Sequence, residues 1–111
     1  MTEVPNKEKA YVSLKKLKDY LLSETHSVGK SKAKLLRSFG FNETNVHLLK
    51  EGLIAIAQTG KLREALKSKY GVKYIIEGKL GTPDGRSIEM RTVWIIEKKQ
   101  TEPRFVTAYP L

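Results

Sequence analysis

Apolar residues in the first half of the chain recur every three or four positions, which is the spacing of amphipathic helices. Residues that can cap a helix stand before these apolar runs, and Gly60 follows the last of them. Three helices are therefore predicted: one capped by Ser13, one over 30–39, and one that Asn42 or Thr44 caps and Gly60 ends.

After the third helix the period shortens, and the apolar residues form runs of strand length. Runs at 70–80 and 86–97 flank the turn sequence TPDG at 82–85, so they are predicted to form a β-hairpin. A last strand is predicted at 104–109. Residues 61–68 fit either a helix or a further strand.

Helices followed by an antiparallel meander predict an α+β fold. About three N-terminal helices are expected to pack on one face of a sheet of three or four strands, which leaves the other face open for a ligand. The length fits one domain over 1–111. Its first ten residues, 1–10, are expected to form an extended arm, because Pro5 disfavours a helical conformation at Val4.

The net positive charge of the chain is the main indication that it binds a negatively charged partner. Twenty-one Lys and Arg face twelve Asp and Glu, which gives a formal net charge of +9. A strongly positive field attracts phosphate backbones and acidic proteins. The same lysines would also serve as a solvated coat without a partner.

Several classes of chemistry are disfavoured. The chain has no Cys, which excludes disulfides, thiol catalysis and cysteine zinc sites, and its two His do not suggest a metal site. No metal and no cofactor are expected. The longest apolar run, 53–57, is too short to span a membrane, and the polar N-terminus lacks an apolar signal core. A cytoplasmic protein is expected.

The segment HSVGKSK is the first candidate for chemistry. His26 precedes the start of a predicted helix, where backbone amides attract phosphate, and Lys30 and Lys32 add positive charge. Histidine can carry a proton near neutral pH. The segment lacks the first glycine of a P-loop, and an ordinary exposed loop would have the same composition.

The last strand is the second candidate. Its alternation places Phe105, Thr107 and Tyr109 on one face. Val106 and Ala108 then lie on the face that packs against the helices. The hydroxyl of Thr107 and the phenol of Tyr109 would meet a phosphate on the open face.

The strand before it is ambiguous. Arg91 alternates with the apolar residues Val93 and Ile95, whereas Trp94 lies on the opposite side. On an open face, Trp94 would be a stacking platform for a nucleobase. In the alternative, Trp94 belongs to the core and Arg91 is a solvated edge residue.

Four stretches of the chain carry a family resemblance: YLLSETHSVGKSKAKLLRSFGF, YGVKYIIEGKL, RTVWIIE and PRFVTAYP. They resemble a small, uncharacterised bacterial domain family that is common in cyanobacteria, as free-standing chains or at the end of large secreted toxins. That family is similar to ribonuclease toxins of the barnase, EndoU, colicin and RelE type of fold.

The resemblance implies a metal-independent endoribonuclease that cleaves tRNA or mRNA through attack of the 2′-hydroxyl. The implied catalytic residues are His26 as acid or base, Lys30 at the phosphate, Arg91 at the pentavalent phosphorus, and Thr107 and Tyr109 at the phosphate oxygens. Around them, the residues expected to bind RNA are Lys32, Lys34, Arg37, Trp94 and Arg104.

The resemblance further implies a toxin–antitoxin system in which a small acidic antitoxin covers the basic face. RNA and that antitoxin are the expected partners, and a membrane is not. Two other interpretations stay open. A non-catalytic nucleic-acid-binding module needs only a basic face with exposed aromatics, and a protein-interaction domain such as an immunity component needs an exposed apolar patch.

Overall fold

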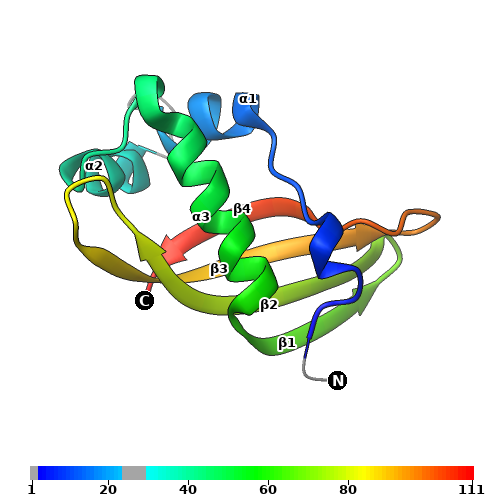
Figure 1. Ribbon diagram of the computed structural model, residues 1–111. Helices are drawn as coiled ribbons and strands as arrows, with labels where there is room; N and C mark the ends of the chain where they lie inside the picture. The colour runs from blue at the N-terminus through cyan, green and yellow to red at the C-terminus, as the bar shows by residue number, and fades with distance from the viewer. Residues whose placement is uncertain (1–2, 24–29) are drawn as a thin grey trace.

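The computed structural model describes residues 3–23 and 30–111, which form a group of helices and one antiparallel sheet (Figure 1). The described helices all precede the strands, so the predicted α+β class is confirmed. In chain order the helical elements are η1 (Lys7–Lys9), α1 (Leu14–Lys16), η2 (Leu17–Leu21), α2 (Lys30–Ser38), η3 (Glu43–Asn45) and α3 (Val46–Thr59). The strands are β1 (Lys61–Ser68), β2 (Gly71–Gly81), β3 (Ser87–Glu97) and β4 (Arg104–Pro110).

The strands pair in the order β1-β2-β3-β4, and each neighbouring pair is antiparallel, which confirms the meander and the hairpin at 82–85. Residues 61–68, for which the sequence allows a helix or a strand, form β1. Leu, Arg, Glu, Ala and Lys favour helix there, but backbone pairing with β2 decides the conformation. The many charged side chains of β1 and its bulge at Arg63 suit the exposed edge of a sheet.

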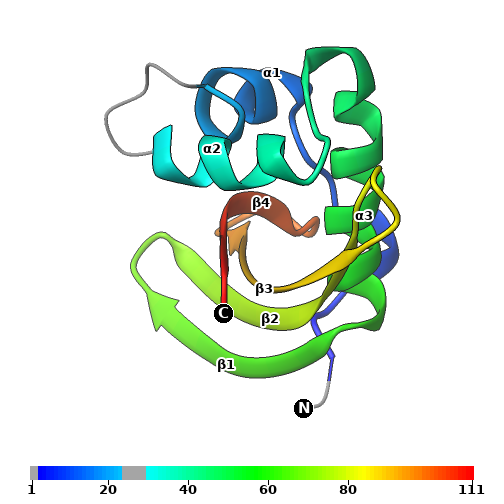
Figure 2. The same cartoon turned by 90° about the vertical axis from the view of Figure 1, so that its left-hand side faces the viewer.

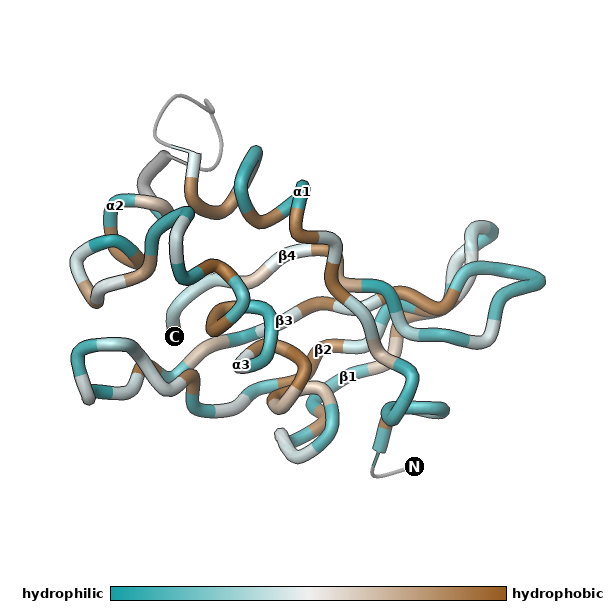
Figure 3. The backbone as a smooth tube through the Cα atoms, turned by 45° about the horizontal axis from the view of Figure 1, so that its top comes forward, coloured by the Kyte–Doolittle hydropathy of each residue, from teal (hydrophilic) through white to brown (hydrophobic). Residues whose placement is uncertain are grey.

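α3 crosses one face of the sheet, whereas α1 and α2 lie toward β4 (Figure 2). Leu49, Leu53 and Ile56 of α3 are buried in one core with Ile76 and Leu80 of β2. In Figure 3 hydrophobic residues gather along α3 and the strands beneath it, while the turns at the ends of the sheet are mostly hydrophilic. The face of the sheet opposite α3 is called the open face below.

Gly60 ends α3 as the sequence predicts, and it does so where the helix comes very close to the sheet. Its N–H donates to Ile56 O at 2.7 Å. A Cβ at this position would lie 2.5 Å from Ile56 O and 2.6 Å from Glu77 O, which leaves room only for glycine.

Trp94 is fully buried, which confirms the alternative that places it in the core, and its interpretation as a stacking platform on the open face is wrong. Its indole N–H donates to Thr92 Oγ1 at 2.8 Å, and the Thr92 hydroxyl donates to Ile76 O at 2.7 Å. The Trp94 ring packs edge-to-face on Phe105, with centroids 5.4 Å apart. Burial of this large ring, with its polar atom satisfied, outweighs any advantage of exposure.

The alternation predicted for β4 is also interrupted. Val93 pairs with Thr107 and Trp94 pairs with Phe105, so Val106 is an extra residue at a β-bulge. The bulge turns Phe105 into the core, although strict alternation would place it on the same face as Thr107.

The N-terminal segment, expected to be an extended arm, contains the 3-10 turn η1 and packs Val4 and Ala10 into the core. Tyr11 then pairs with Arg104 in an isolated parallel bridge beside β4. Ser13 caps α1 as predicted, because its Oγ accepts from Lys16 N–H at 3.3 Å. Within the described part of the chain, none of the helices has the length and apolar character needed to cross a membrane.

Candidate functional site

The open face of the sheet carries a row of charged and aromatic side chains. Glu77 of β2, Arg91 of β3 and Tyr109 of β4 are direct cross-strand partners. Their strand neighbours Ile76 and Thr92 are buried under the helices, so strand alternation directs Glu77 and Arg91 to the open face.

Glu77 connects three strands through two arginines. Its carboxylate accepts one hydrogen bond from Arg91 Nε and one from Arg63 Nε, both at 2.8 Å, and Arg91 Nη2 lies 2.6 Å from Oε2. These hydrogen bonds hold the pKa of Glu77 below its usual range despite its partial burial, and the bond from Arg91 has the larger effect. In return, Glu77 and then Tyr109 raise the pKa of Arg91. Glu77 is therefore an ionised carboxylate that fixes both guanidinium groups.

The Tyr109 ring has two cations near it, and they come from opposite halves of the sequence. The Arg91 guanidinium is 6.0 Å from the centroid of its ring, and Lys32 Nζ is 5.6 Å from it. Lys32 Nζ also donates to Thr107 Oγ1 at 3.0 Å. The N-terminal part of α2 thus brings a lysine to the side chains of β4.

We call these side chains the open-face cluster: Lys32, Arg63, Glu77, Arg91, Thr107 and Tyr109. The cluster contains three cations and one carboxylate, so it keeps an excess of positive charge. A hydroxyl and a phenol stand beside the cations. Guanidinium, ammonium and hydroxyl donors together can bind a phosphate and stabilise extra charge on it. Among the described residues, no group of three or more His, Asp or Glu side chains could hold a metal ion.

Residues 3–111 match the sequence model of DUF6883, a domain of unknown function. The chain belongs to the DUF6883 family. No curated protein matches it. In overall fold this DUF6883 chain is similar to a chain of a solved structure described as a contact-dependent growth inhibition toxin - immunity protein complex from Klebsiella pneumoniae 342. The TM-score is 0.72 at 18% identity, and the match covers 94% of this chain and 95% of that chain. At that identity the likeness establishes the fold.

The family match agrees with the resemblance to an uncharacterised bacterial domain family, and the link to ribonuclease toxins stays a prediction. Of the five residues predicted to be catalytic in this DUF6883 chain, the structure brings Arg91, Thr107 and Tyr109 together. His26 lies outside the described residues. Lys30 is the first residue of α2, and its side chain is outside the description as well.

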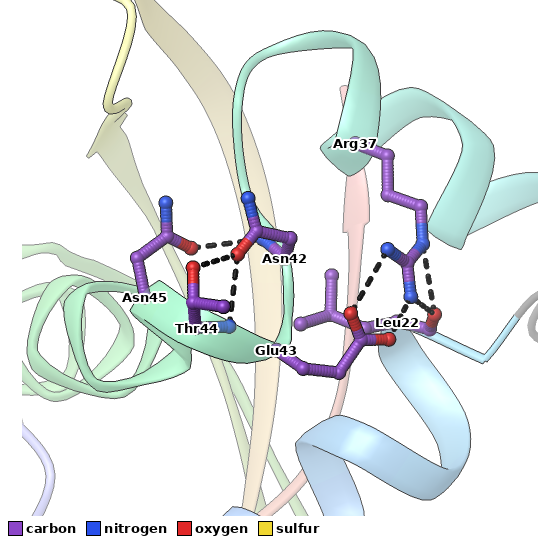
Figure 4. Close-up of polar contacts among 6 residues, drawn as sticks. All are labelled: Leu22, Arg37, Asn42, Glu43, Thr44 and Asn45. Atoms are coloured by element: carbon purple, nitrogen blue, oxygen red, sulfur yellow. Dashed lines mark hydrogen bonds and ion pairs between the residues drawn. The ribbon is translucent and has the colours of Figure 1, made fainter.

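Arg37, expected to bind RNA, is engaged within the protein (Figure 4). Its Nη2 and Nε donate to Leu22 O at 2.6 and 3.1 Å, and its guanidinium pairs with the carboxylate of Glu43. The hydrogen bond from Arg37 lowers the pKa of Glu43. The figure also shows Asn42, which caps η3 beside this pair because its Oδ1 accepts a hydrogen bond from the Thr44 N–H. Arg37 therefore links α2 to the segments on either side of it.

The remaining residues expected to bind RNA are spread over the molecule. Lys32 lies in the open-face cluster, and Lys34 is exposed on α2. Arg104 starts β4 and pairs with Ile95 at the other end of the open face, where its Nη2 lies 2.7 Å from Glu97 Oε1.

Glu77 and Arg63 are the members of the cluster that the sequence analysis missed. Counting outward from the turn sequence at 82–85 would place Glu77 opposite Met90, whereas the loop spans 82–86 and places it opposite Arg91. Arg63 gave no signal either, because it lies at a bulge in a segment whose secondary structure the sequence leaves undecided.

Proposed function

We propose that this chain is a metal-independent endoribonuclease toxin. The observation that carries the proposal is the meeting of Lys32, Arg91, Thr107 and Tyr109 on the open face, from elements far apart in the sequence. Guanidinium, ammonium, hydroxyl and phenol groups are donors that bind phosphate oxygens. Because Glu77 holds the Nε–Nη2 edge of Arg91, the guanidinium is oriented before RNA binds.

In the proposed reaction, a base takes the proton of a ribose 2′-hydroxyl, and O2′ forms a bond to the adjacent phosphorus. The bond from phosphorus to the 5′-oxygen of the next nucleotide breaks, and that oxygen gains a proton from an acid. The products are a 2′,3′-cyclic phosphate and a 5′-hydroxyl. Arg91 and Lys32 would stabilise the added negative charge of the pentavalent phosphorus, and Thr107 and Tyr109 would donate to its oxygens. His26 is the proposed acid or base.

The toxin role rests on the fold neighbour together with charge. The solved complex contains a toxin and an immunity protein, so the likeness supports either role. The formal charge of +9 favours the toxin role, because a positive protein attracts RNA. An immunity protein has to cover its toxin, and a positive immunity protein would repel a basic nuclease. The proposed protein partner is small and acidic and covers the open face. The proposed place of action is the cytoplasm, where tRNA and mRNA lie.

The proposal is tested by incubating the purified protein with labelled tRNA and mRNA in the presence of EDTA. We expect cleavage that leaves 2′,3′-cyclic phosphate ends. Arg91→Gln and Lys32→Gln should each slow cleavage by about 100-fold or more, since each removes a cation at the developing charge. His26→Ala should abolish cleavage without unfolding the protein. Lys15→Gln, which removes an exposed lysine of α1, is the control and should cleave at the wild-type rate.

Two outcomes would contradict the proposal. Wild-type activity in a folded Arg91→Gln protein would remove the open-face cluster from the reaction. An absolute requirement for magnesium would replace the metal-independent mechanism with another one.

A further inference from the structure

The open face continues from the cluster into an apolar pocket of about 460 Å³. Leu66, Lys73 and Ile95, which line it, are cross-strand partners on β1, β2 and β3. Tyr70, in the turn between β1 and β2, also lines the pocket and is 66% exposed, and Leu66 is 45% exposed. A large aromatic ring and a leucine thus face solvent beside an apolar hollow.

The pocket and the open-face cluster lie on the same side of the sheet. Lys73 is four residues from Glu77 on β2, and Ile95 is four residues from Arg91 on β3. An even separation keeps side chains on one face, and four strand residues span about 13 Å. One extended RNA strand can therefore reach both places.

The rim of the pocket is cationic. Lys67 lines it, and Lys69 Nζ lies 5.2 Å from the centroid of the Tyr70 ring. Glu97 is the acidic side chain in the lining, and its carboxylate is already paired with Arg104 Nη2 at 2.7 Å. A ligand with flat apolar faces and negative charges beside them complements this combination.

We propose that the pocket binds an unpaired nucleobase of the RNA whose phosphodiester group occupies the open-face cluster. This proposal rests on the proposed function and deepens it, because it names single-stranded RNA as the substrate class. A base stacked on Tyr70 would place its backbone phosphates near Lys67, Lys69 and Lys73. A base inside a duplex has both faces covered and cannot stack on the ring. Trp94 cannot serve this purpose, since it is buried.

The test uses a fluorescent 2′-O-methyl oligonucleotide, which cannot be cleaved by 2′-hydroxyl attack, and measures binding by anisotropy. Tyr70→Ala should weaken binding by roughly 5- to 100-fold, the loss that follows removal of one stacked base. Tyr70→Trp should keep most of the affinity. Leu66→Ala should also weaken binding, whereas Leu48→Ala, a matched exposed leucine on α3 at 41% exposure, should not.

Probes that lack one base in turn identify the stacked position. At that position the abasic probe should bind wild type more weakly, and Tyr70→Ala should cause no further loss. Poly-L-glutamate supplies negative charge without bases, so its binding should not change in Tyr70→Ala. Unchanged oligonucleotide binding in Tyr70→Ala would overturn the proposal. An equal loss for poly-L-glutamate would also overturn it, because the pocket would then take an acidic polypeptide.

Binding of the uncleavable probe and cleavage of ordinary RNA are separate measurements. A wild-type protein that binds the probe through Tyr70 but leaves RNA intact would end the nuclease proposal and keep the base pocket. A protein that cleaves RNA but binds independently of Tyr70 and Leu66 would end the base pocket and keep the nuclease.

Discussion

The Thr92 hydroxyl makes two hydrogen bonds inside the core. It accepts a hydrogen bond from the Trp94 indole and donates one to Ile76 O, so both polar groups are satisfied inside an apolar core. Among the described residues, Thr92 is the one polar residue that is buried. With Thr92 and Trp94 held inside, Arg91 has to point to the open face. A core hydrogen bond is thereby connected to the position of a proposed catalytic residue.

Thr92→Val should lower the free energy of unfolding by about 1–3 kcal/mol, because the Trp94 N–H would stay buried without an acceptor. Urea unfolding followed by tryptophan fluorescence measures this change. The control is Thr101→Val in the exposed turn before β4, which should stay within about 0.5 kcal/mol of wild type. Equal stability of the two variants would show that the Thr92 hydroxyl does not matter to the core.

Carboxylate–arginine pairs connect the elements to one another. Glu77 joins β1, β2 and β3, and Glu43 joins η3 to α2. Asp84 closes the β2–β3 turn by accepting hydrogen bonds from Arg86 and Thr82. The hydrogen bond from Arg86, and after it the one from Thr82, lowers the pKa of Asp84 from 3.8 to about 2.

Acid should loosen these connections. A carboxylate whose pKa is lower in the folded protein than in the unfolded chain binds fewer protons in the folded state. Its stabilising effect is therefore complete above the ordinary pKa and is lost as the pH falls through the pKa of the folded state. The melting temperature should therefore fall from about pH 4.5, the ordinary value of Glu77, toward pH 2. Thermal melts across this range measure the effect, and Glu77→Gln should flatten part of the dependence. A Glu77→Gln protein with the acid sensitivity of wild type would contradict the role given to this carboxylate.

On the scale of the whole molecule, the two faces of the sheet carry different side chains. The face under α3 buries the core, whereas the open face places cations at one end and an apolar pocket at the other. The formal charge of +9 is thus accompanied by a local concentration of cations around Tyr109. In the proposed function, the long-range field and the local cations would both attract the phosphates of RNA.

Binding of the 2′-O-methyl probe should weaken as salt increases, because bound phosphates displace counterions. For a single strand the slope of log K against log salt is about −0.7 per neutralised phosphate. Arg91→Gln or Lys32→Gln should each make the slope shallower by up to that amount, and Lys15→Gln should leave it unchanged. The measurement is a salt series of anisotropy titrations. Identical slopes in all three variants would place the bound phosphates elsewhere.

Part of the candidate site was predictable from the sequence. Thr107 and Tyr109 follow from alternation on the last strand, and Lys32 from the charge at a helix start. Glu77 was hidden because a single carboxylate in an apolar strand gives no sign of the two arginines that reach it. The pairing of Lys32 with Thr107 could not be predicted, since it depends on how α2 lies against β4.

By itself the sequence determined the periods of the helices and strands, the TPDG hairpin and the end of α3 at Gly60, because spacing, turns and caps act on neighbouring residues. Only the tertiary structure decided that 61–68 is a strand, that Trp94 points inward and that Val106 forms a bulge. A strand with apolar residues on both faces does not specify which face is buried. That choice is made by the helices that cover it and by the pairing partners that fix its register.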